Sequence, residues 1–119
     1  MVPHRVDGYL PIGAYGLIGD CCSAALVGGD GSIDWLCLPR FDDASLFGRI
    51  LDAQRGGYWR IAPAGPHQTT QRYCDRSNVL QTTFATRTGV VTLTDFMPVE
   101  GQPLTFPERH TAPRTPLLQ

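Results

Sequence analysis

The chain has 119 residues, of which 42% are hydrophobic, and this length and composition suit one globular domain or part of one. Its formal net charge is −1, and its ten basic residues are all arginines, spread along the chain from Arg5 to Arg114. Because these arginines form no cluster, the sequence offers no electrostatic footprint for nucleic acid or for an anionic membrane.

The N-terminal residues 1–8 are predicted to be a flexible end. Residues 9–19 (YLPIGAYGLIG) contain too many turn formers for a helix, so we expect an extended, partly buried strap across a sheet. This stretch is too short to span a bilayer, and Asp20 stands where a signal cleavage site would need a small residue. The sequence therefore predicts a soluble, cytoplasmic protein with reduced thiols.

A β-hairpin is predicted next, because residues 23–27 and 33–38 are apolar and flank the turn sequence GGDGS. Strict alternation along the second strand places Ile33, Trp35 and Cys37 on one face. The opposite face then carries Asp34, an exposed strand position in this reading, together with two leucines. With apolar residues on both faces, the strand is expected inside a sandwich or under another domain.

Pro39 ends that strand, and a short helix is predicted to follow. Asp42 or Asp43 would cap it, and its apolar face would be formed by Leu46, Phe47, Ile50 and Leu51.

Beyond this point the apolar period changes to two, which predicts strands at 58–62, 68–73, 78–86 and 90–96, the last two joined as a hairpin at 87–89. From residue 101 four prolines and no apolar period predict a disordered tail. The expected fold is mainly β: a partial antiparallel sandwich over 9–100 with one short helix, followed by a Pro-rich tail over 101–119.

The four cysteines contain no C-x-x-C spacing, and the three histidines are isolated. We therefore predict neither a metal site nor a cofactor. Cys37 lies in an apolar strand and is expected to be a small buried hydrophobe.

The run YGLIGDCCSAALVGGDGSIDWLCLPRFDDASLFGRILD, with GGYWRIAP, NVLQTTF and VVTLTDFMPV, resembles the start of bacterial family 15 glycoside hydrolases of the trehalase and glucoamylase-like type. In that family this part belongs to an N-terminal β-sandwich that precedes an (α/α)6 barrel carrying the catalytic glutamates. The resemblance covers about residues 9–99 and implies an inverting α-glucoside hydrolase as the parent, whose sandwich is represented here only by its first part.

Inverting hydrolysis needs two carboxyl groups that flank the glycosidic bond. The two glutamates, Glu100 and Glu108, lie at or inside the tail, and the turn, strand and cap positions of the aspartates have structural explanations. We therefore predict that this chain alone is catalytically inactive.

Three residues are candidates for contact with a barrel or a sugar: Trp35, Arg40 and Phe41. For Trp35 the alternative is a place in the core, and for Arg40 it is a structural salt bridge to Asp42 or Asp43.

Two functions follow: a non-catalytic sandwich segment that supports the barrel in cis or in trans, or a stand-alone β module that binds carbohydrate or protein. A non-functional gene remnant is a third reading. If sandwich strands are missing, open edges and an uncovered apolar face predict weak stability or self-association.

Overall fold

The computed structural model describes residues 3–99, and the predicted Pro-rich tail lies outside them. The described part consists of β-strands and one short 3-10 helix, η1 (Ile12–Ala14). The strands are β1 (Tyr15–Gly19), β2 (Ala24–Gly28), β3 (Ser32–Cys37), β4 (Ser45–Phe47), β5 (Trp59–Arg60), β6 (Gln68–Tyr73), β7 (Leu80–Ala85) and β8 (Val90–Asp95). Each strand pairing is antiparallel, which confirms the predicted mainly β, antiparallel fold.

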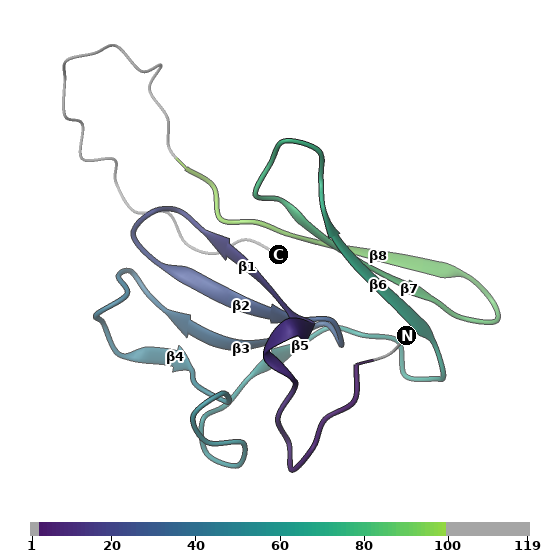
Figure 1. Ribbon diagram of the computed structural model, residues 1–119, viewed down its shortest axis with the longest axis horizontal. Coiled ribbons are helices and arrows are strands. Elements are labelled where there is room, and N and C mark those ends of the chain that lie inside the picture. The colour runs from purple at the N-terminus through teal and green to yellow at the C-terminus, as the bar shows by residue number, and fades with distance from the viewer. Residues whose placement is uncertain (1–2, 100–119) are drawn as a thin grey trace.

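The strands form two sheets. The first has the order β1-β2-β3-β4, with β5 also paired to β3, and the second has the order β6-β7-β8. Figure 1 shows the second sheet lying obliquely beside β1. Its Tyr73 hydroxyl donates to the Leu17 carbonyl (2.7 Å) and accepts from the Leu17 N–H (2.8 Å), so this side chain covers backbone groups on the free edge of β1.

Both predicted hairpins form. β2 and β3 are joined by a turn in which Gly31 has a φ of +82°, a backbone conformation that favours glycine. A Cβ at this position would collide with the Ile61 carbonyl oxygen, so both backbone conformation and space call for glycine here. The second hairpin joins β7 to β8, as the turn formers around Gly89 predicted.

The predicted helix after Pro39 is wrong. Residues 45–47 instead form β4, in which Phe47 pairs with Leu36 and Ser45 pairs with Cys37, and a turn follows at 49–51. The apolar spacing of this segment also suits a short edge strand. The open edge of β3 offers backbone hydrogen-bond partners, whereas a helix of only a few residues is unstable on its own because its nucleation is unfavourable. Asp43 does cap backbone, since its carboxylate accepts the Arg40 N–H at 2.9 Å, but it closes a turn rather than a helix.

A β-bulge overturns the predicted faces of β3. Trp35 pairs with Leu26 and Ile33 pairs with Val27, so Asp34 is the extra residue between two pairs. Ile33 and Trp35 therefore lie on opposite faces, whereas strict alternation had placed them together. Ile33 joins the core, and Trp35 lies with Leu26 on the outer face, half-buried.

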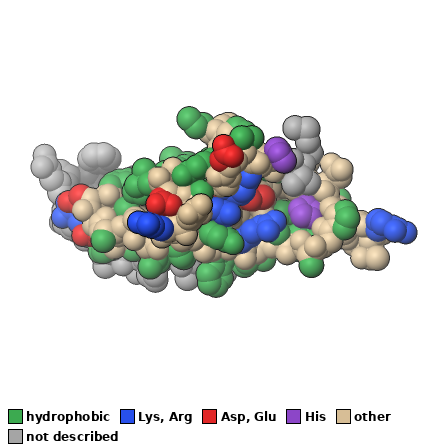
Figure 2. All heavy atoms as spheres, turned by 90° about the horizontal axis from the view of Figure 1, so that it is seen from below, with side chains coloured by type: hydrophobic (Ala, Val, Ile, Leu, Met, Phe, Trp, Pro, Cys, Tyr) green, Lys and Arg blue, Asp and Glu red, His purple; other side chains and the backbone are tan. Residues whose placement is uncertain are grey.

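The core lies where the two sheets meet. It contains Ile18, Ala25, Val27, Ile33, Leu36, Leu80 and Met97, so strands of the first sheet pack against β7 of the second. Figure 2 shows a long face of the molecule on which positive and negative side chains are interspersed among hydrophobic ones.

Candidate functional site

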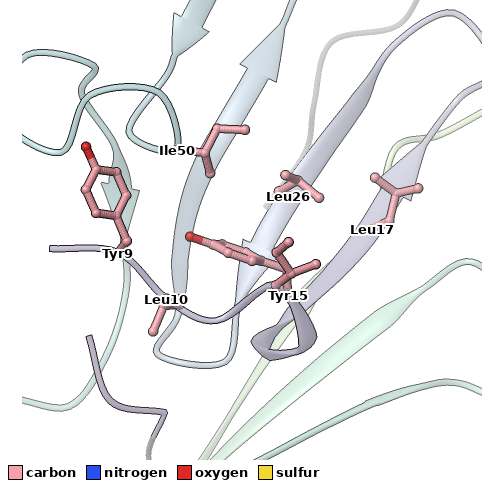
Figure 3. Close-up of a pocket in the computed structure, with 7 residues that line it drawn as sticks. Tyr9, Leu10, Tyr15, Leu17, Leu26 and Ile50 are labelled. Atoms are coloured by element: carbon pink, nitrogen blue, oxygen red, sulfur yellow. The ribbon is translucent and has the colours of Figure 1, made fainter. Parts of the chain in front are cut away.

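An apolar groove lies on the outer face of the first sheet. The segment before β1, together with β1, β2 and the turn after β4, lines a cavity of about 550 Å³ through these residues: Tyr9, Leu10, Ile12, Tyr15, Leu17, Leu26 and Ile50. Figure 3 shows Leu17 and Leu26 projecting from neighbouring strands, with the Tyr15 ring between Leu10 and Leu26. Except for two tyrosine hydroxyls, the lining side chains are hydrocarbon.

The groove leaves large apolar side chains open to solvent. Leu17 is 53% exposed and Ile12 is 92% exposed, although Leu10 at the base is buried. The outer face of a sandwich sheet normally alternates polar residues with the buried ones, because it meets water. Leu17 and Leu26 break that rule, which is typical of a face that another protein surface covers.

A buried polar cluster fastens the N-terminal segment beside this groove. Arg5 donates from Nε to Asp30 (2.9 Å) and from Nη2 to Asp34 (2.9 Å) and Ser32 (2.7 Å). Its third nitrogen, Nη1, donates to the Gly8 carbonyl at 2.9 Å. The Asp34 side chain is 0% exposed, so the prediction that Asp34 is an exposed strand position is wrong. The bulge turns Asp34 out of register and toward Arg5.

Arg49 approaches the same carboxylate from the turn after β4. Its Nη1 lies 3.6 Å from Asp34 Oδ1, and its guanidinium carbon lies 3.7 Å from the centre of the Tyr58 ring, a cation–π geometry. Two arginines thus balance the charges of Asp30 and Asp34. A buried charge pair of this kind is costly to break, although its formation adds little net stability.

Tyr15 connects the polar cluster to the groove. Its ring lines the cavity, and its hydroxyl donates to Asp34 Oδ2 at 2.6 Å. Burial and then the hydrogen bond to Asp34 raise the pKa of Tyr15 to about 12, so the hydroxyl stays protonated at neutral pH. The shape of the groove therefore depends on the cluster beneath it.

This cluster does not have the properties of an acid and base pair. Burial alone would raise the pKa of Asp30, but hydrogen bonds from Ser32 and Arg5 and the charge of Arg5 hold it below its usual range. A general acid needs the opposite shift. Asp34 Oδ2 accepts hydrogen bonds from both Arg5 and Tyr15, so this oxygen is already engaged within the cluster.

The three residues predicted from the sequence do not lie together. Arg40 and Phe41 sit at the exposed corner between β3 and β4, where Arg40 Nε pairs with Asp42 at 3.0 Å. They line a second, smaller cavity with Asp42 and two cysteines, and Trp35 is not among its lining residues. The salt bridge expected as the structural role of Arg40 is present, and both partners remain more than half exposed.

Sequence reasoning missed the groove and Arg5. The leucines of β1 and β2 are adjacent only through the register that pairs Leu17 with Leu26. Arg5 lies 25 residues before Asp30, in a segment with no pattern of its own. The Gly-Asp turn predicted a hairpin, but no local feature indicated that Asp30 would also bind Arg5 of the N-terminal segment.

Two further properties bear on the possible classes of site. Within residues 3–99, no three His, Cys, Asp or Glu side chains come together in a way that would hold a metal ion. None of the helical structure in that same range is long and apolar enough to cross a membrane.

Known proteins give a consistent match. A 42% identical trehalase from Thermoplasma volcanium aligns over 112 residues, 88% of this chain but 18% of the relative. Trehalases from Mycolicibacterium smegmatis (38% over 94 residues) and Thermoplasma acidophilum (43% over 90 residues) cover 78% and 71% of the chain. The chain spans 14% and 15% of those two relatives. No solved structure matches significantly.

The family model described as trehalase-like, N-terminal, matches residues 7–105. This range contains the whole of both sheets, the groove and all of the polar cluster except Arg5. The chain therefore belongs to the trehalase-like N-terminal domain family.

Proposed function

We propose that this chain is a non-catalytic N-terminal segment of a trehalase-like α-glucoside hydrolase of glycoside hydrolase family 15, and that it supports a catalytic (α/α)6 barrel in cis or in trans. The observation that carries the proposal is the apolar groove on the outer sheet face, where Leu17 is half exposed. An aliphatic surface of this kind suits contact with another protein domain. The relatives add context, since the chain corresponds to less than a fifth of their length.

The exposed corner is a second part of the proposed contact. Arg40 and Phe41 are 56% (side chain) and 59% exposed, respectively. Arginine donates to carboxylates in a fixed fork, so Arg40 suits a carboxylate of the barrel. Trp35, on the same outer face as the groove, would extend the apolar contact. The proposal places the protein in the cytoplasm, consistent with four cysteines that are all free.

A stand-alone carbohydrate-binding module is less well supported. Sugar recognition needs polar side chains that fix hydroxyl groups, and the groove offers only two tyrosine hydroxyls. One of these, Tyr15, already donates to Asp34, and the other, Tyr9, accepts the Ala53 N–H at 3.1 Å.

A chimaera tests the proposal. The matching N-terminal region of the Thermoplasma volcanium trehalase is replaced by this chain, and glucose release from trehalose is measured with Leu17→Asp and with Val90→Asp as a control. Both residues are exposed and lie on strands, but Val90 is on the second sheet, which contributes no residue to the lining of the groove.

We expect an active chimaera that Leu17→Asp inactivates and Val90→Asp leaves active. Equal activity of the two variants would remove the groove from the interface. The chain alone is expected to release no glucose from trehalose or maltose, and turnover by it would refute the non-catalytic role.

A further inference from the structure

Two adjacent cysteines form the tip of the β1–β2 hairpin. The strands end at the pair Gly19 and Ala24, and Cys21 and Cys22 are the central residues of the connecting turn. Cys21 is exposed with a φ of +70°, Cys22 is half-buried, and both thiols are free. The turn is held by Asp20, whose Oδ1 accepts the N–H groups of Cys22 (2.9 Å) and Ser23 (2.8 Å).

The cysteine turn and the β3–β4 corner share one cavity. The Phe41 N–H donates to the Cys22 carbonyl at 3.0 Å, so the two loops are joined at one end of the first sheet. Figure 1 shows both connections at that end. Between them lies a cavity of about 200 Å³ lined by Cys21, Cys22, Arg40, Phe41 and Asp42. Both cysteines therefore line the same small space, together with Phe41.

The geometry does not favour a disulfide within this pair. Adjacent Cα atoms are about 3.8 Å apart across a trans peptide, whereas disulfides usually join Cα atoms about 4.4–6.8 Å apart. A direct S–S bond between neighbours is therefore strained and easily reduced. A third atom bonded to both sulfurs relieves this strain, because it enlarges the ring that the two side chains form with the backbone between them.

The donor set also does not suit zinc. A structural zinc site takes four ligands, whereas two cysteines line the cavity and the Asp42 carboxylate is paired with Arg40 at 3.0 Å. Soft thiolates prefer soft, thiophilic elements. Two cysteines beside one aromatic residue instead suit a thiophilic atom that bonds to two sulfurs and also carries an organic group.

We propose that Cys21 and Cys22 form a two-thiol binding site for trivalent organoarsenic compounds of the form R–As=O. Both S–H bonds and the As=O bond break, two As–S bonds form, and the oxygen leaves as water with both protons. Arsenic stays trivalent, so no oxidant or reductant is needed. The organic group occupies the cavity against Phe41.

The other two cysteines are poor competitors. Cys37 is 2% exposed, and burial, with a contribution from the charge of Asp43, raises the pKa of its thiol above the ordinary value. Cys74 is half-buried and directly follows β6 of the second sheet, without a neighbouring cysteine in sequence.

Phenylarsine oxide is the probe, used on the full-length chain. Intact-mass spectrometry should show one phenylarsenic group bound with loss of one water, and 2,3-dimercaptopropanol should remove it. Cys22→Ser should lose this adduct, and Cys74→Ser should keep it. Cys22→Ser preserves the turn, because the hydrogen bonds that residue 22 makes to Asp20 and Phe41 use its backbone.

A second measurement on the unmodified chain does not depend on any variant folding. After arsenical treatment, N-ethylmaleimide labelling mapped by mass spectrometry should spare Cys21 and Cys22 and still label Cys74. Failure of the unmodified chain to bind the probe, persistence of the adduct in Cys22→Ser, or protection of other cysteines in place of this pair would each overturn the proposal.

Discussion

Arg5 provides the sharpest test of how the N-terminal segment is held. Its side chain is 17% exposed and forms ion pairs of 2.9 Å with both Asp30 and Asp34, whose side chains are 9% and 0% exposed. Arg5→Met keeps most of the side chain's length but leaves two buried carboxylates without their main positive partner. We expect the free energy of unfolding to fall by about 3–5 kcal/mol, the usual cost of breaking a buried charge pair.

The measurement is urea unfolding followed by circular dichroism, with Arg87→Met as the matched control. Arg87 is an exposed residue of the β7–β8 turn, so its loss should change the free energy of unfolding by less than about 0.5 kcal/mol. Small domains have only about 5–15 kcal/mol in total, so Arg5→Met is compared with the parent in trimethylamine N-oxide if it unfolds in buffer.

The competing view is that residues 1–8 are flexible and that Arg5 behaves as a surface residue. An exposed pair contributes about 0–1 kcal/mol, so a loss below about 1 kcal/mol would refute the reasoning. The double variant Arg5→Met/Asp34→Asn adds a second check. Its loss should be smaller than the sum of the two single losses by at least about 0.5 kcal/mol, because the two residues interact directly.

Three further predictions follow, two on pH and one on backbone conformation. Folding lowers the pKa of Asp30, so the stability that its carboxylate contributes is full above the ordinary pKa of 3.8 and is lost as the pH falls through the folded pKa. Urea midpoints measured from neutral to acid pH should therefore fall more steeply for the parent than for Asp30→Asn. Folding raises the pKa of Tyr15 from 10.0 to about 12, so the stability that its hydroxyl contributes is present below pH 10 and is lost as the pH rises through 12. Tyr15→Phe should flatten this alkaline fall in stability. An unchanged dependence of stability on pH would contradict the buried hydrogen bond to Asp34. Gly31→Ala should destabilise the protein by more than about 1 kcal/mol, because φ is +82° and the Ile61 carbonyl fills the space that a Cβ would need. In the control Gly65→Ala the new Cβ meets nothing within 4 Å, so its stability should stay within about 1 kcal/mol of the parent. Equal melting temperatures of the two variants would count against this turn conformation.

Some of the candidate contact residues could be predicted from the sequence, and others depend on how the strands are paired. Arg40 and Phe41 were selectable from the sequence because a proline ends the preceding strand and leaves an exposed corner. Trp35 was selected as well, but its face was misassigned until the bulge at Asp34 was known. The groove itself had no sequence signal, since its lining residues come from three stretches of the chain, at 9–17, 26 and 50, that only the fold brings together.

The sequence by itself determined the class of fold and the two hairpins, because turn chemistry and a period of two are local properties that neighbouring residues specify. The family was indicated by the resemblance of a continuous run of residues to its members. Tertiary structure decided three other features: β4 in place of a helix, the bulge that buries Asp34, and the closure of Arg5 over the first sheet. Each depends on partners far along the chain. An open strand edge, a buried carboxylate and a distant guanidinium act on one another only after the strands have been brought together, so no window of neighbouring residues records them.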